Sequence, residues 1–220
     1  MSHFVLVPGA GGAGWYWHRV VPLLQAAGHT AIAIDLPADD ESAGLSRYAD
    51  LVVAETTPET ILVGLSLGGF TIAMVAARVP VGGLIFVNAM VPAPHETPGE
   101  WGDAVGSTEA RIAAAKAGGY SETFDDETYF FHDVAPELVA KSAQYDKPEA
   151  AIAFGDHCEL ASWPKVPIRA LVGADDRLFP VELQRRITRE RLGVEIEIIP
   201  GGHLAPLSHP EALAEKLGQS

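Results

Sequence analysis

The chain has 220 residues, of which 48% are hydrophobic and 20% are charged, and its formal net charge at pH 7 is −14. This length suits one domain with a sizeable core, and the composition is ordinary for a soluble globular protein. The negative charge would repel phosphate backbones, so no nucleic-acid partner is expected. No uninterrupted apolar run reaches membrane-spanning length, so no membrane partner is expected either.

The N-terminal residues and the cysteine content indicate the compartment. The chain carries no Lys or Arg before Arg19, whereas a secretory signal begins with a basic region. We therefore expect a cytoplasmic protein. Cys158 is the only cysteine, which excludes an internal disulfide and a cysteine-based zinc site. We interpret it as a small apolar side chain.

Short apolar runs alternate with helical patterns along most of the chain, which predicts a doubly wound, mostly parallel α/β sheet. Continuously apolar runs are typical of strands covered on both faces. The last run alternates with polar residues, so it is expected at an exposed edge of the sheet. The six expected strands are Phe4–Val7, Ala31–Ile34, Ile61–Gly64, Leu84–Val87, Ile168–Val172 and Val194–Ile199.

One long interval interrupts this alternation. Between Val87 and Ile168 no convincing strand occurs, and helical patterns such as Glu109–Ala117 and Pro136–Gln144 predominate. We interpret residues 92–164 as a small helical cap inserted after the fourth strand, and residues 1–91 and 165–220 as the core. The walls of a substrate pocket are expected to be drawn from a pool of cap aromatics, and the alternative is that most of them are simply cap core. This pool is Trp101, Tyr129, Phe130, Phe131, Phe154 and Trp163.

The first strand leads into a glycine-rich loop at residues 9–14. Gly9, Gly11 and Gly14 have the G-x-G-x-x-G spacing of a dinucleotide-binding turn. Asp35 closes the next strand about 20 residues later, where a ribose-binding carboxylate would lie. A lone glycine pattern is weak support, and none of the five tyrosines has the lysine four residues on that a short-chain dehydrogenase needs.

A stronger pattern follows the third strand. Gly64, Ser66 and Gly68 spell G-x-S-x-G, which is typical of a nucleophile elbow, a strained turn between a strand and a helix. Such a turn places the serine at a helix N-terminus, where free N–H groups face any oxyanion formed nearby. A helix-capping serine between incidental glycines is the alternative interpretation.

An aspartate and a histidine follow the fifth and sixth strands. A serine hydroxyl needs a base to take its proton, and the base needs a carboxylate to fix its tautomer. His203 can be that base, and Asp175 or Asp176 can be that carboxylate. We favour Asp176 from its place within Gly173–Pro180. The chain order Ser, Asp, His is the hydrolase order.

Taken together, the motifs resemble the α/β-hydrolase fold family, and more narrowly its compact branch of plant methyl esterases and hydroxynitrile lyases. The resemblance covers everything outside the cap. It implies a catalytic triad of Ser66, His203 and Asp176, and an oxyanion hole made by the backbone N–H groups of Ala10 and Leu67. The motifs that carry it are residues 6–10 and 14–17, the elbow at 64–69, and residues 86–89, 173–180 and 202–203.

The chain departs from this branch in three ways. The usual histidine before the first-loop glycine is Pro8 here, which leaves the support of that loop open. Lyase members resemble one another in a lysine directly after the catalytic histidine, which holds the cyanide leaving group, and in a threonine in the first loop. Here these positions are Leu204 and Gly9. Ester hydrolysis is therefore favoured over cyanohydrin cleavage.

The strand order decides between a phosphate loop and an oxyanion loop. In the order 2-1-3-4-5-6, the loops after strands one and three flank one crevice. A pyrophosphate on residues 9–14 would collide with the elbow there. We therefore interpret the glycine loop as part of the oxyanion hole, and Asp35 as an ordinary residue at a strand end.

The expected function is that of a serine carboxylesterase cleaving a small, largely apolar ester through an acyl-enzyme. We expect a small-molecule substrate as its partner and neither a cofactor nor a metal, and a homodimer is compatible with the sequence. Two alternatives stay open. One is a non-catalytic ligand-binding or receptor protein of the same fold, and the other is a lyase or carbon–carbon hydrolase using the same triad.

Overall fold

The computed structural model describes residues 1–219 and is organised around one sheet of six strands. Every pair of neighbouring strands is parallel, and the order is β2-β1-β3-β4-β5-β6, as predicted. The last strand lies at an edge of the sheet, which confirms the prediction made from its alternating pattern. The strands are β1 (His3–Val7), β2 (Thr30–Ala33), β3 (Thr60–Leu65), β4 (Gly83–Val87), β5 (Ile168–Gly173) and β6 (Ile196–Ile199).

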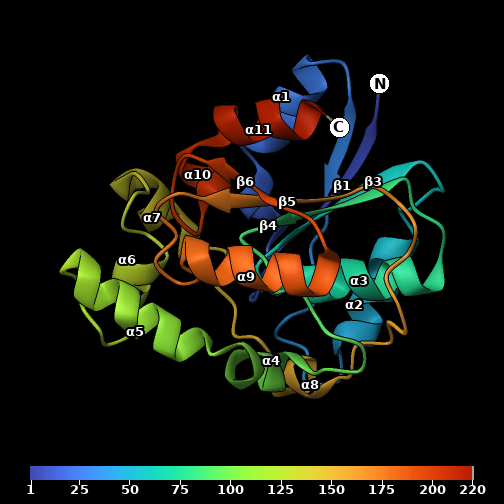
Figure 1. Ribbon diagram of the computed structural model, residues 1–220. Helices are drawn as coiled ribbons and strands as arrows, with labels where there is room; N and C mark the ends of the chain where they lie inside the picture. The colour runs from blue at the N-terminus through green and yellow to red at the C-terminus, as the bar shows by residue number, and fades with distance from the viewer. Residues whose placement is uncertain (220) are drawn as a thin grey trace.

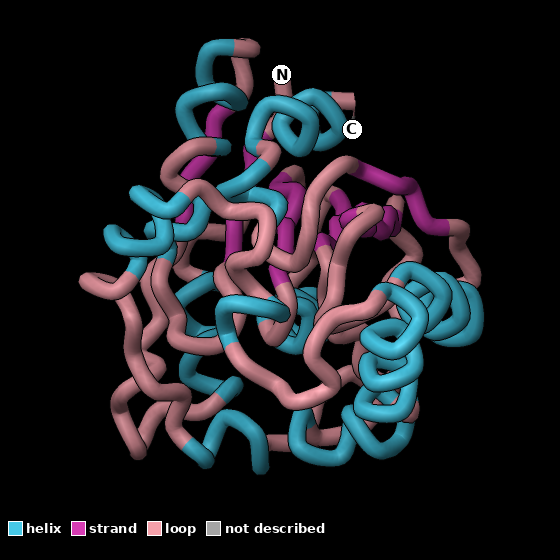
Figure 2. Tube along the Cα trace, turned by 90° about the vertical axis from the view of Figure 1, so that its left-hand side faces the viewer, coloured by secondary structure: helices cyan, strands magenta, loops and turns pink. Residues whose placement is uncertain are grey.

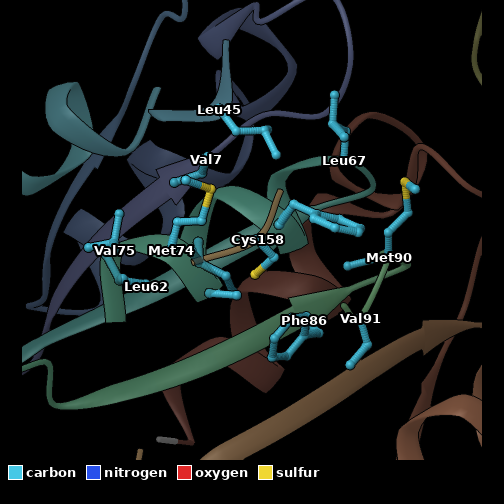
Figure 3. Close-up of a cluster of buried hydrophobic side chains, with 14 of the residues drawn as sticks. Val7, Leu45, Leu62, Leu67, Met74, Val75, Phe86, Met90, Val91 and Cys158 are labelled. Atoms are coloured by element: carbon cyan, nitrogen blue, oxygen red, sulfur yellow. The ribbon is translucent and has the colours of Figure 1, made fainter. Parts of the chain in front are cut away.

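Successive strand residues point to opposite faces of the sheet, and helices cover both faces, so the strands need apolar side chains on each side. On one face, Leu62 and Phe86 join a buried cluster that includes Cys158, as Figure 3 shows. On the other face, Val63 and Val87 belong to a second cluster. Figure 1 shows α2 (Leu45–Val53), α3 (Gly68–Arg78) and α9 (Val181–Leu192) on the first face, and α1 (Val20–Ala26) and α11 (Pro210–Gly218) on the second.

Residues 92–164, the inserted segment, connect β4 to β5 and contain helices and loops without a strand. The predicted helices appear as α5 (Ser107–Gly118) and α7 (Pro136–Ser142). These helices gather along the left and lower sides of Figure 1, and Figure 2 views the molecule from its left side, with the strands at the centre. The other helices of the segment are α4 (Pro98–Val105), α6 (Asp126–Tyr129) and α8 (Ala151–Gly155).

Two short helices complete the chain. The 3-10 helix η1 (Gly14–Trp17) follows the glycine loop, and α10 (Ala205–Ser208) follows β6. Within residues 1–219, every helix is too short or too polar to cross a lipid bilayer.

A largely buried ion pair holds the start of the inserted segment. Arg191 in α9 donates to both carboxylate oxygens of Glu96, at 2.5 and 3.0 Å, and to the carbonyl of Val91 at 2.7 Å. The two side chains are only 16% and 8% exposed. The same carboxylate accepts the N–H of Ala93 at 2.9 Å. Removal of Glu96 would therefore leave the Arg191 guanidinium without its carboxylate and the N–H of Ala93 unpaired.

Glu96→Ala is expected to lower the free energy of unfolding by about 3 kcal/mol, because it leaves the Arg191 guanidinium buried without its carboxylate. Glu182→Ala is the matched control, since its pair with Arg185 is exposed (82% and 36%), and it should cost less than about 1 kcal/mol. Equilibrium unfolding in urea measures both. Similar small losses in the two variants would contradict the importance of the buried pair.

Candidate active site

Ser66 lies in a tight turn between a strand and a helix. β3 ends at Leu65 and α3 begins at Gly68, so the turn is only two residues long. The φ angle of Ser66 is +52°, which an L residue rarely adopts. The turn also needs a glycine, because a Cβ at Gly68 would lie 2.6 Å from the carbonyl oxygen of Pro8. The turn at Ser66 therefore has the tight, strained geometry that the G-x-S-x-G pattern predicts.

His203 follows β6 and is bonded to Asp176. Its Nδ1 lies 3.0 Å from Oδ2 of Asp176, and the two side chains are 1% and 0% exposed. Its Nε2 is buried and has no hydrogen-bond partner among the described residues. One ring nitrogen is thus held by a carboxylate, while the other is free at the wall of a cavity that Ser66 also lines.

The carboxylate of Asp176 accepts four hydrogen bonds. Oδ1 accepts the N–H groups of Leu178 and Phe179, each at 2.9 Å. Oδ2 accepts from the Gln184 side chain at 3.1 Å as well as from His203. Donors on both oxygens fix the orientation of the carboxylate toward the imidazole. By contrast, the neighbouring Asp175 is exposed and no bond joins it to His203.

Asn88, which sequence reasoning did not select, ties the histidine loop to the sheet. It follows β4 directly, has a φ angle of +45° and is fully buried. Its Nδ2 donates to the carbonyls of Gly202 and His203 at 2.9 and 3.0 Å, and its Oδ1 accepts the N–H of Gly173 at 2.7 Å. One side chain therefore joins the loops after β4, β5 and β6.

A carboxylate of the inserted segment also supports the histidine loop. Oδ2 of Asp133 accepts the N–H of Gly202 at 2.6 Å, directly before His203. No local pattern in the sequence indicates this contact, because Asp133 and Gly202 are 69 residues apart.

The two backbone groups expected to form the oxyanion hole lie in the turns that follow β1 and β3. Ala10 lines the cavity, and Leu67 is the N-cap residue of α3. Within the described residues, neither N–H donates a hydrogen bond. Both groups are therefore unpaired within the protein, and one of them belongs to a residue of the cavity wall.

Asp35 is engaged within the protein. Its Oδ1 accepts the N–H of Gly14 at 2.8 Å, and the next residue, Leu36, donates its N–H to the carbonyl of Gly12 at 2.8 Å. These bonds hold the far end of the glycine loop. The carboxylate that could have bound a ribose thus serves as a loop anchor.

The cavity that contains Ser66 and His203 has a volume of about 400 Å³. Its apolar wall includes Leu65, Phe130, Phe131, Val139 and Leu204, and its polar wall includes Tyr16, Ser142, Asp126, Asp146, Lys147 and Glu149. A volume of this size suits a small organic molecule. Most of the polar lining comes from the inserted segment, where the sequence shows no recognisable motif.

Of the six aromatic residues from which pocket walls were expected to be drawn, Phe130 and Phe131 line this cavity. The other four lie outside its walls. Trp101 and Tyr129 are buried within the protein, Trp163 packs edge-on against Phe86, and Phe154 is 38% exposed. Aromatic residues stabilise helix packing as well as pockets, and their side-chain type does not distinguish the two uses.

Burial raises the pKa values of a tyrosine that lines the cavity and of the core cysteine. Burial raises the pKa of the Tyr16 phenol, and the carboxylates of Asp146 and Asp126 raise it further. Burial also raises the pKa of the Cys158 thiol to about 11, so it stays protonated in the core. Among the described residues, no group of three or more His, Cys, Asp or Glu side chains is arranged to hold a metal ion.

Residues 4–216 match the family described as the alpha/beta hydrolase family. The chain belongs to this family. The probable esterase PIR7A of Oryza sativa subsp. indica is 41% identical to this α/β hydrolase over 106 residues, covering 42% of the chain and 40% of the rice protein. The alpha-hydroxynitrile lyase of Arabidopsis thaliana is 34% identical over 112 residues, covering 44% and 43%.

The fold is that of known α/β hydrolases. The structure of the methylesterase MES16 from Arabidopsis superposes with a TM-score of 0.76 at 22% identity, covering 100% of this chain and 98% of that one. These likenesses confirm the predicted resemblance to plant methylesterases and hydroxynitrile lyases. The matches to the rice and Arabidopsis sequences span less than half of each relative, and they include both an esterase and a lyase. The reaction must therefore be argued from the site.

Proposed function

We propose that this α/β hydrolase is a serine carboxylesterase that cleaves a small, neutral, largely apolar ester. The observation that carries the proposal is the environment of His203. Its Nδ1 is bonded to a buried carboxylate, and its Nε2 is unpaired at a cavity shared with Ser66. A base with one nitrogen fixed and the other free is what a serine nucleophile requires.

In the proposed reaction, Ser66 Oγ attacks the ester carbonyl while Nε2 of His203 takes the hydroxyl proton. The tetrahedral intermediate then collapses, the bond to the alcohol oxygen breaks, and His203 protonates the leaving group. A water molecule deprotonated by His203 then attacks the acyl-enzyme, the bond to Ser66 Oγ breaks with release of the acid, and His203 returns the proton to Ser66 Oγ. Asp176 accepts the Nδ1–H bond throughout and stabilises the imidazolium.

Developing negative charge on the carbonyl oxygen needs donors that are already in place. We assign this task to the backbone N–H groups of Ala10 and Leu67, which are unpaired within the described residues. The N-terminus of α3 lies beside Ser66 and adds the positive end of a helix dipole.

The cavity lining supports the choice of substrate. Leu65, Phe131 and Val139 offer apolar contact to an acyl or alcohol group. The exposed carboxylates of Asp126 and Asp146 would repel an anionic substrate, so a neutral ester is favoured. We further propose that residues 92–164 act as a cap over this site.

Cyanohydrin cleavage is less well supported. Leu204 and Gly9 occupy the positions where the lyases carry lysine and threonine, and both line the cavity. A Cβ at Gly9 would lie 2.9 Å from the Cβ of Ser66, so a threonine there would need the loop to shift. Lys147 lines the cavity, but its ammonium group is bonded to Asp39 at 2.9 Å. Among the described residues that line the cavity, no cation is thus left free to hold cyanide.

A ligand-binding protein with the same cavity is the second candidate. A serine-reactive phosphonate distinguishes the two functions, because it forms a covalent adduct only with an activated serine. Labelling of the wild type, with no labelling of Ser66→Ala, supports the esterase. Absence of both labelling and turnover of a panel of chromogenic esters would support a binding protein.

Ser66→Ala and His203→Ala are each expected to remove nearly all ester hydrolysis, because members of a triad act as a unit. Asp176→Asn should lower kcat by up to ~10⁴, since the amide favours the wrong imidazole tautomer. Asp175→Asn is the matched control and should change kcat little. Steady-state kinetics on a chromogenic ester measure all four variants. If Asp175→Asn carried the large loss instead, the choice of carboxylate would be wrong.

Ala10→Pro tests the oxyanion donor. Residues 9–12 form a β-turn with Ala10 at the second position, where proline is well tolerated, so the substitution removes the N–H while keeping the turn. The expected loss of kcat is ~10²–10³, with KM less affected. Ala10→Ser retains the N–H and should be nearly silent. Equal kcat in both variants would exclude Ala10 as a donor.

Phe131→Ala enlarges the apolar wall, and we expect it to shift preference toward longer acyl chains by about tenfold in relative kcat/KM. Phe154→Ala is the control, because Phe154 does not line the cavity. A panel of p-nitrophenyl esters of rising acyl length measures the shift. An unchanged preference in Phe131→Ala would place the acyl group elsewhere.

A further inference from the structure

A partly buried carboxylate lies beside the glycine loop and takes no part in the reaction above. Oε2 of Glu149 accepts the N–H of Gly11 at 2.8 Å, and its Oε1 accepts the hydroxyl of Tyr48 at 2.6 Å. Burial raises the pKa of Glu149. The nearest basic side chain in sequence, Lys147, is bonded to Asp39 instead. A carboxylate placed in this way costs desolvation free energy, which points to a purpose other than stability.

The bond from Gly11 acts on the central peptide of a β-turn. Gly12 donates its N–H to the carbonyl of Gly9 at 3.1 Å, and Gly11, at the third position, has a φ angle of +82°. These are the marks of a type II turn. Types I and II differ mainly by a flip of the central peptide, and a glycine at the third position tolerates both. The backbone alone therefore does not decide between them.

The carboxylate of Glu149 favours one of the two turn types. In the observed turn, the N–H of the central peptide points to the carboxylate. In the flipped turn, the carbonyl oxygen of Ala10 would take its place and be repelled by the carboxylate. The carboxylate therefore stabilises one turn and destabilises the other.

We infer that Glu149 is a positioning residue, which by binding the N–H of Gly11 anchors the turn at residues 9–12 whose second residue, Ala10, supplies the proposed oxyanion donor. The inference rests on the proposed function. It also explains what supports the loop after Pro8, where the family's usual histidine is missing. A side chain of the inserted segment, 138 residues away from Gly11, supplies that support.

Other contacts keep Glu149 in place. Ala150, the next residue, donates its N–H to the carbonyl of Ala38 at 2.7 Å. Tyr145 stacks on Trp15 with ring centroids 4.9 Å apart. The stretch 145–150 is thus attached to the core on both sides of Glu149. The carboxylate is therefore held in place and can hold the glycine loop in turn.

The test compares three variants by ester hydrolysis. Glu149→Ala should lower kcat by about 10- to 100-fold with KM changed by less than about threefold, because only the transition state uses the oxyanion donor. Glu149→Gln should restore most of the loss, since its amide oxygen can accept from Gly11 and its amide nitrogen can donate to Tyr48. Asp39→Ala removes a different tie to the same stretch and should keep wild-type kcat.

A double variant separates this role from general damage. In Ala10→Pro the donor is already absent, so adding Glu149→Ala should cost little more in kcat. Amide hydrogen exchange of a peptide covering residues 9–12 should be faster in Glu149→Ala and unchanged in Asp39→Ala. The exchange readout does not depend on turnover, so it tests the inference even if the ester assays show that the proposed function is wrong. Unchanged exchange, a multiplied loss in the double variant or an unchanged kcat in Glu149→Ala would each overturn the inference.

Discussion

The strained backbone of Ser66 is the constraint on which the rest of the site depends. A serine with a φ angle of +52° costs roughly 1–3 kcal/mol, so its surroundings must hold it. Its N–H donates to the carbonyl of Val87 at 3.3 Å, and its own carbonyl accepts the N–H of Met90 at 3.0 Å. On the opposite side, the loop after β1 approaches so closely that only glycine fits at position 68. The turn is thus clamped between the ends of β1 and β4, which fixes where the hydroxyl can lie.

The same short stretch after β4 also supports the histidine. Asn88 lies between Val87 and Met90, and its amide bonds the loops that follow β5 and β6. The positive φ angle of Asn88 aims this side chain along the carboxyl ends of the strands. The turn of Ser66 and the loop of His203 therefore share one support, although 137 residues separate the two side chains in sequence (203 minus 66). A displacement of residues 87–90 would disturb both at once.

Much of this arrangement could be predicted because its signals are local. Apolar runs mark the strands, and a parallel sheet brings the residues after each strand to one edge. The positions of Ser66 and Asp176 follow from that rule. The contacts of Asn88 and Glu149 could not be predicted, because they join residues 114 and 138 positions apart. Asn88 lies in one of the motifs that carry the resemblance, but that motif does not indicate its partners. Which aromatic residues of the inserted segment line the cavity could not be predicted for another reason, since a buried tryptophan such as Trp101 has the same composition signal as a wall residue.

The inserted segment meets the core in two different ways, and this difference bears on how specificity could change. Phe131 and Val139 line the cavity, and neither forms a side-chain hydrogen bond to the loops that carry the proposed catalytic groups. Glu149 lines the same cavity but also bonds the glycine loop, and Asp133 bonds the histidine loop. On the proposed mechanism, substitutions at Phe131 and Val139 can change the shape of the cavity while the catalytic loops stay in place. At Glu149 fit and turnover are coupled, because one side chain serves both as wall and as support.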